Sequence, residues 1–182
     1  MALSATLRNF EIELANIDHH VYDSLTFKVA QHPSEHNERV AVRVLARALA
    51  HEEGLEFGRG LSTVEDPALW LKDPMGQIVH WIDVGAPSAQ RLHKSSKQAQ
   101  RVSVYSDKNK TNLQNEWRGQ KIHQADSITL VHFDAAFIAT LSEHLGKQNK
   151  WSVTLTEGYL SVGFGDQTAD CQLEVSTVGA LL

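Results

Sequence analysis

The segment from residue 78 to residue 105 constrains the fold more than any other part of this sequence. Residues 78–84 read IVHWIDV, a nearly continuous apolar run that is typical of a strand covered on both faces. The proline and serine at 87–88 suit the first turn of a helix, which we expect over residues 88–100. Residues 102–105 then predict a second strand. A strand, a helix and a strand in this order form a crossover, so we expect the two strands to lie parallel in one sheet.

Further elements are expected on both sides of this crossover. Alternating apolar residues predict an N-terminal hairpin with strands at 5–15 and 24–29. A helix is expected from residue 34 to residue 51, with Ser34 as its N-cap and its three arginines exposed. Other strands are predicted at 55–61, 127–133, 151–156, 158–164 and 171–175, and other helices at 110–118 and 134–145.

Basic residues are concentrated in one part of an otherwise acidic chain. The 182 residues include 17 Lys and Arg against 22 Asp and Glu, for a net charge of −5. Between Ala89 and Lys121 there are eight basic residues and only two acidic ones. Such a stretch is typical of a phosphate-binding surface, although a solvated helix face followed by a loop has the same composition. The eight are Arg91, Lys94, Lys97, Arg101, Lys108, Lys110, Arg118 and Lys121.

The sequence lacks the features of several protein classes. No apolar run approaches the roughly 18 residues of a membrane helix, and the N-terminus lacks a signal-peptide layout, so we expect a cytoplasmic protein without a membrane partner. Cys171 is the only cysteine, which excludes a disulfide within the chain and an all-cysteine zinc site. Phosphate-binding-loop, dinucleotide-binding and GxSxG motifs are absent. His32 and His36 are four residues apart, but Pro33 between them favours ordinary surface histidines over paired metal ligands.

Two acidic positions adjoin expected ends of secondary structure. Glu65 and Asp66 directly precede a proline, and Asp83 ends the most apolar strand. A buried carboxylate is costly unless a cation, a basic side chain or a metal neutralises it, and converging carboxylates suit Mg²⁺ or Mn²⁺. On a helical wheel Arg91 and Lys94 share the flank beside the packing face of the following helix, and Lys94 is the better candidate to approach Asp83. An ion pair of Asp83 with Lys94 or Arg91, without chemistry, stays open at this point.

Three segments carry a resemblance to a known family. HPSE at 32–35, GLSTVEDPALW at 60–70 and WIDVGAPSAQRLHKSSKQA at 81–99 resemble the signature segments of the bacterial YaeQ family. That family is grouped with the PD-(D/E)xK nucleases, so the resemblance implies a restriction-endonuclease-like core. We therefore expect one domain over residues 1–182 with an α/β fold, built on an α+β mixed sheet. The N-terminal hairpin and antiparallel C-terminal strands would be additions to that core.

The resemblance also implies a set of site residues. The lysine that the nuclease motif places two residues after Asp83 is replaced by Gly85, so the (D/E)xK pair is broken here. Lys94 on the next helix is the expected substitute. The implied catalytic residues are Glu35, Asp66, Asp83 and Lys94, and the implied ligands of a Mg²⁺ or Mn²⁺ ion are Glu65, Asp66 and Asp83.

Two functions are consistent with these residues. The first is a metal-dependent phosphodiesterase or nuclease, in which Arg91, Lys97 and Arg101 contact the phosphates of a nucleic acid. The second is a non-catalytic module that keeps the nuclease-like fold and binds nucleic acid or protein. The order of the acids favours the first function, whereas the replaced lysine and the net charge of −5 favour the second. The resemblance assigns no biological role.

Overall fold

The alternating N-terminal residues form a hairpin at one edge of the first of two sheets. The computed structural model describes residues 4–182, and in it β1 (Thr6–Asn16) pairs antiparallel with β2 (Val21–Gln31). On its other side β1 pairs in parallel with β8 (Gln148–Thr156). The antiparallel strands β9 (Tyr159–Phe164) and β10 (Gln167–Gln172) complete the order β10-β9-β8-β1-β2. The predicted hairpin and the predicted antiparallel C-terminal strands are both confirmed.

The predicted crossover forms the centre of the second sheet. Strands β5 (Ile78–Val84) and β6 (Ala99–Ser106) pair in parallel and are joined by α2 (Ala89–Gln98). Ser88 opens α2 as predicted, because its hydroxyl accepts the backbone N–H of Arg91 at 3.1 Å. The sheet order is β11-β7-β6-β5-β4-β3, and the further strands are β3 (Glu56–Phe57), β4 (Leu69–Lys72), β7 (Thr129–His132) and β11 (Glu174–Thr177). Two mixed sheets with helices confirm the predicted α/β class.

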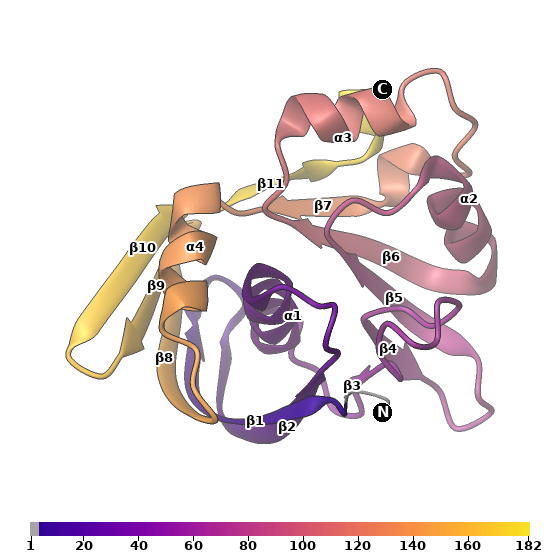
Figure 1. The fold of residues 1–182 in the computed structure, drawn as a ribbon. Helices are drawn as coiled ribbons and strands as arrows, with labels where there is room; N and C mark the ends of the chain where they lie inside the picture. The colour runs from indigo at the N-terminus through magenta and orange to yellow at the C-terminus, as the bar shows by residue number, and fades with distance from the viewer. Residues whose placement is uncertain (1–3) are drawn as a thin grey trace.

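Helix α1 (Asn37–Leu49) lies between the two sheets, as Figure 1 shows. It contacts β1 and β2 on one side and β5 and β6 on the other, and eight of its 13 residues are buried. Helix α4 (Ala135–Glu143) packs beside it. The larger apolar core therefore surrounds α1 and draws on both sheets.

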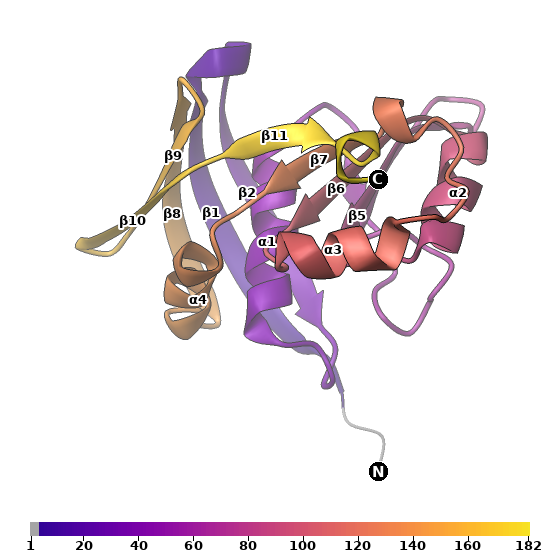
Figure 2. The same cartoon turned by 90° about the horizontal axis from the view of Figure 1, so that it is seen from above.

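A second, smaller core lies on the opposite face of the second sheet. Helices α2 and α3 (Lys110–Trp117) cover that face, on the side away from α1 (Figure 2). Successive side chains of a strand point to opposite faces, so along β5 Trp81 packs in this second core while Ile82 packs in the larger one. Asp83 shares the face of Trp81 and therefore points toward α2.

Several predicted boundaries are wrong. The helix predicted to residue 100 ends at Gln98, and β6 begins at Ala99 although the strand was predicted from residue 102. The helix predicted from Ser34 begins at Asn37 after the N-cap His36, because the Ser34 hydroxyl instead bonds the His32 ring at 2.6 Å. The strand predicted at 55–61 is limited to β3, since the backbone N–H of Arg59 bonds the carboxylate of Asp66 at 3.0 Å and no longer pairs with β4.

The strand predicted at 171–175 is in fact divided between the two sheets. Residues up to Gln172 belong to β10, and residues from Glu174 belong to β11. Buried Leu173 lies at the crossing, and its N–H bonds the carbonyl of Gly158 at 2.7 Å. Within residues 4–182, no helix is long and apolar enough to cross a membrane.

Substitutions of Trp117, at the end of α3, measure how much its side chain stabilises the second core and the loop after β5. It is fully buried, and its Nε1 donates to the carbonyl of Pro87 at 2.8 Å. We expect Trp117→Ala to lower the free energy of unfolding by about 3–5 kcal/mol, because it opens a large cavity. Trp117→Phe should cost about 1–3 kcal/mol, chiefly because the Pro87 carbonyl loses its donor. Urea unfolding measures both, and a loss below about 0.5 kcal/mol for Trp117→Phe would contradict a role for the hydrogen bond.

Candidate functional site

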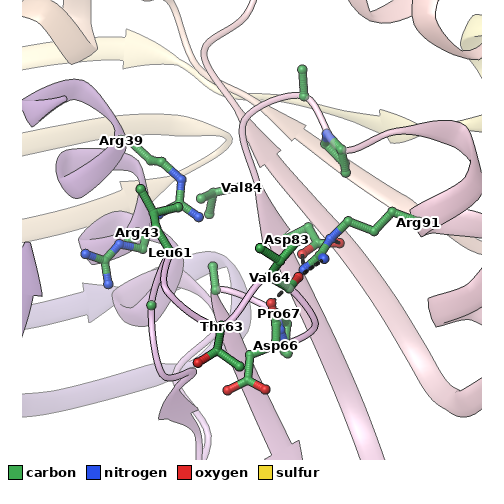
Figure 3. A pocket seen from close by; sticks show the side chains of 14 residues that line it. Arg39, Arg43, Leu61, Thr63, Val64, Asp66, Pro67, Asp83, Val84 and Arg91 are labelled. Carbon is green, nitrogen blue, oxygen red and sulfur yellow. Dashed lines mark hydrogen bonds and ion pairs between the residues drawn. The ribbon is translucent and has the colours of Figure 1, made fainter. Parts of the chain in front are cut away.

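A cavity of about 210 Å³ opens at the carboxyl end of β5, where α1, α2 and the loop of residues 58–68 meet. Figure 3 shows side chains from each of these elements around it. A neighbouring cavity of about 410 Å³ shares Arg39 with it and is lined by Glu35. The structure therefore brings the acids Glu35, Asp66 and Asp83 into one region. The charged residues that line the first cavity are Arg39, Arg43, Asp66, Asp83 and Arg91.

The carboxylate of Asp83 is held by Arg91. The guanidinium donates from Nε to Oδ2 at 2.9 Å and from Nη2 to Oδ1 at 2.8 Å, a two-bond arrangement of the strong type. The indole Nε1 of Trp81 donates to Oδ2 at 2.9 Å. Asp83 is only 3% exposed, so this pairing neutralises a buried charge.

Lys94 does not occupy the position predicted for it. Its side chain is exposed, and within residues 4–182 it makes no ion pair or side-chain hydrogen bond. Arg91 lies in the first turn of α2, directly beside the end of β5, whereas Lys94 lies about one turn further along the helix. The ion pair of Asp83 therefore forms with Arg91, one of the two partners that the sequence left open.

Arg91 also holds the loop that carries Asp66. Its Nη1 donates to the carbonyl of Val64 at 2.6 Å, and its Nη2 donates to the carbonyl of Asp66 at 2.7 Å. All three nitrogens of the guanidinium are thus engaged inside the protein. The contact of Arg91 with phosphates stays a prediction, and these bonds commit each of its three nitrogens to an acceptor within the chain.

The carboxylate of Asp66 is paired with a second arginine, which lies in the same loop. Arg59 donates from Nε to Oδ2 at 2.8 Å and from Nη2 to Oδ1 at 2.9 Å, and its backbone N–H reaches Oδ2 at 3.0 Å. These bonds, with the Arg59 side-chain bonds contributing most, lower the pKa of Asp66 to about 2. Glu65 points away from the cavity and lines an exposed hollow that Lys94 also lines.

The carboxylate of Glu35 is paired with two arginines of α1. Arg43 donates from Nε to Oε1 at 2.7 Å and from Nη2 to Oε2 at 2.8 Å, and Arg39 donates to Oε1 at 2.7 Å. The resemblance makes Glu35 an acid of the helix, but Glu35 lies in the turn before α1, which begins at Asn37. Arg43, predicted to be exposed, is buried, and this burial lowers the pKa of its guanidinium.

These contacts test whether the predicted acids fit a Mg²⁺ or Mn²⁺ ion. A divalent ion needs carboxylate oxygens that converge on one point, at about 2.1 Å from Mg²⁺. In this structure each carboxylate has its own arginine, which binds both of its oxygens. The pairs are Glu35 with Arg43, Asp66 with Arg59, and Asp83 with Arg91. Over residues 4–182 no group of three or more His, Cys, Asp or Glu side chains is arranged to hold a metal. The acids as arranged do not fit a divalent ion.

The basic stretch divides into paired and unpaired residues. Arg91, Arg101, Lys108 and Lys110 form ion pairs with Asp83, Glu52, Asp107 and Glu174 respectively. Arg101, predicted to contact phosphates, therefore has an acidic partner at 2.8 Å within the chain. Among the described residues, the other four make no ion pair, and they are Lys94, Lys97, Arg118 and Lys121.

Sequence reasoning missed the arginines that close Asp66 and Glu35. For Glu35 a signal exists, because Arg39 and Arg43 follow it by four and eight residues, close to a helical repeat. For Asp66 no periodic signal exists, because Arg59 reaches it across an irregular loop.

Comparisons with known proteins agree with the resemblance noted in the sequence. A family model described as "YaeQ protein" matches residues 1–173. The "Uncharacterized protein YaeQ" of Salmonella typhi is 29% identical over 175 residues, covering 95% of this chain and 96% of that protein. The protein of the same name from Escherichia coli (strain K12) is 28% identical over 162 residues, covering 88% and 89%.

Two crystal structures have the same fold. The YaeQ protein from Pseudomonas syringae matches with a TM-score of 0.85 and 32% identity, over 94% of this chain and 95% of that one. The YaeQ protein from Xanthomonas axonopodis pv. citri matches with a TM-score of 0.82 and 26% identity, over 94% and 98%.

Substitutions at Arg91 and Lys94 distinguish the observed partner of Asp83 from the predicted one. We expect Arg91→Ala to lower the free energy of unfolding by about 2–4 kcal/mol, because it leaves a buried carboxylate unpaired beside a partly exposed position. Lys94→Ala, on the same helix, should change it by no more than about 0.5 kcal/mol. Chemical unfolding of both variants measures the difference, and the reverse order would place Lys94 on Asp83.

The substitution Arg59→Gln tests whether the ion pair with Arg59 lowers the pKa of Asp66. A lowered pKa contributes stability that is complete above the ordinary aspartate value near 3.8 and is lost as the pH falls toward about 2. Without the guanidinium the pKa should return to the ordinary value or above it, since burial alone raises it. An NMR titration of the side-chain carboxyl carbon reads this directly. Arg101→Gln, which breaks an exposed pair, is the control and should leave the Asp66 titration unchanged.

Proposed function

This chain belongs to the YaeQ family, and we propose that it is a non-catalytic module that binds nucleic acid and keeps the layout of a nuclease-like core. The proposal has two parts, the lack of metal-dependent chemistry and the class of partner. Each part is supported by a different set of side chains.

The pairing of the three acids with arginines supports the lack of metal-dependent chemistry. Glu35, Asp66 and Asp83 each receive at least two charge-assisted hydrogen bonds from an arginine. Bonds of this type are about twice as strong as neutral ones, and removing one partner of a buried pair costs about 3–5 kcal/mol. Ion binding would have to break such pairs before any ligand oxygen became available. The acids therefore serve the fold, and this single observation carries the proposal.

The four residues of the basic stretch that make no ion pair support a nucleic acid as the partner. Lys94, Lys97, Arg118 and Lys121 are without acidic partners among residues 4–182, although the chain carries a net charge of −5. Acidic residues are abundant enough to pair with them, so their isolation favours an external polyanion.

A metal-dependent phosphodiesterase is the competing function. One observation favours it: Asp66 and Asp83 line the same cavity, in agreement with the order of acids in the PD-(D/E)xK nucleases. This function requires Arg59 and Arg91 to release their carboxylates. Lys94, the expected substitute for the missing lysine, makes no contact with Asp83 in the present arrangement.

Calorimetry with Mn²⁺ separates the two functions. We expect no saturable binding at millimolar Mn²⁺, and no cleavage of labelled DNA or RNA, because the guanidinium groups occupy the ligand oxygens. Asp66→Asn is the preferred comparison, since the arginine that it frees is 72% exposed and folding should survive. Circular dichroism checks that the variant is folded. Saturable Mn²⁺ binding that is lost in Asp66→Asn and in Asp83→Asn, with cleavage lost in parallel, would establish the nuclease instead.

A further inference from the structure

We propose that His93, Lys97, Lys121 and His123 form the surface that contacts the phosphates of the bound nucleic acid. We call these four residues the α2–α3 cationic patch. This inference rests on the proposed function and adds the location and chemistry of the binding surface. The patch lies apart from the cavity at the end of β5, which none of its four residues lines.

The fold brings the four residues together from two segments. His93 and Lys97 are four residues apart on α2, so they lie on one face of the helix. Lys121 and His123 belong to the segment that follows α3 and runs beside α2 (Figure 1). The rings of His93 and His123 meet edge to face, with centroids 6.4 Å apart.

The second core fixes this arrangement. Leu92 of α2 and Trp117 of α3 are both fully buried in it, and Ile122, between the two patch residues of its segment, packs against it. The bond from Trp117 to the carbonyl of Pro87 ties the end of α3 to the start of α2. The patch is therefore built on packed elements rather than on a free loop.

The charges around His93 are all of one sign. Burial lowers the pKa of His93, and Lys97, Lys121 and His123 lower it further. The buried Nδ1 of His93 has no hydrogen-bond partner, and a contact with the backbone of Lys121 acts in the opposite direction and raises the pKa. Lys97 and Lys121 make no ion pair among residues 4–182. A group of cationic side chains without a counter-charge favours an anion.

The same chemistry argues against a metal ion and against a protein partner. Two imidazoles are too few ligands for a structural zinc site, and the adjacent ammonium groups repel a cation. Protein interfaces depend on buried aromatic or apolar anchors. None of the exposed large apolar side chains of residues 4–182 belongs to the patch; they are Leu7, Ile17, Tyr22, Val64, Met75, Tyr159, Val175 and Leu182. A phosphate backbone needs no such anchor.

Salt-dependent binding to a short fluorescein-labelled DNA duplex, measured by fluorescence anisotropy, tests the patch. Each phosphate contact adds about 0.9 to the slope of log affinity against log salt, so the double variant Lys97→Gln/Lys121→Gln should lower the slope by about two. At low salt its affinity should fall about tenfold or more. The matched control is Lys28→Gln/Lys147→Gln, which changes the net charge equally at two exposed lysines outside the patch and should leave the slope almost unchanged.

The outcomes separate this inference from the proposed function. DNA binding with an unchanged slope in Lys97→Gln/Lys121→Gln overturns the patch and leaves the proposed function standing. No binding of the wild type to DNA or to an RNA of the same sequence overturns both. Binding to poly-glutamate as tight as binding to DNA assigns the patch to an acidic protein and overturns the nucleic-acid partner.

Discussion

The position of α1 between two sheets determines the environment of every charged group on that helix. Its sides face apolar residues of both sheets, so a guanidinium on it is taken out of water. A buried charge is tolerated only with a partner and with satisfied hydrogen bonds. Arg43 meets this requirement with Glu35 and with the carbonyl of Ala30 at 3.0 Å. The acid that a nuclease would use is thereby committed to the packing of the helix.

Asp66 and Asp83 are also paired with arginines, but the three arginine side chains differ in exposure. Arg43 is buried, Arg91 is 26% exposed and Arg59 is 72% exposed in their side chains. Salt and solvent screen an exposed pair more than a buried one, so the pair at Asp66 is the weakest of the three. Arg91 has a wider role, because it joins β5, α2 and the loop before β4 through four hydrogen bonds. The charge that a metal ion would bring to this region is supplied by the chain itself.

Much of the fold could be predicted because the relevant signals are local. The apolar run of residues 78–84, the capping serine at 88 and the alternation in β1 each depend on neighbours within a few positions. The crossing at Leu173 could not be predicted, because Cys171, Leu173 and Val175 alternate like one strand. Only the partner strands reveal that Val175 belongs to another sheet, where it is 66% exposed.

The site was harder to predict because its pairs depend on distances across the fold. The wheel of α2 correctly placed Arg91 and Lys94 on one flank, but the choice between them depends on where the helix begins relative to the end of β5. Arg59 reaches Asp66 from a loop whose path no periodicity encodes. Local patterns specify the elements, whereas the contacts between their ends decide which charges meet.

The parallel pairing of β1 with β8 has a consequence for the order of folding during synthesis. Asn9 is in register with Gln148, so β1 meets one of its two neighbours only after most of the chain has been made. Until then the apolar face of the hairpin, with Phe10, Ile12 and Leu14, lacks that neighbour and one edge of β1 is open. Open edges and non-local pairings slow folding and invite intermolecular association. The nascent chain therefore passes through a long interval in which its first strand needs protection.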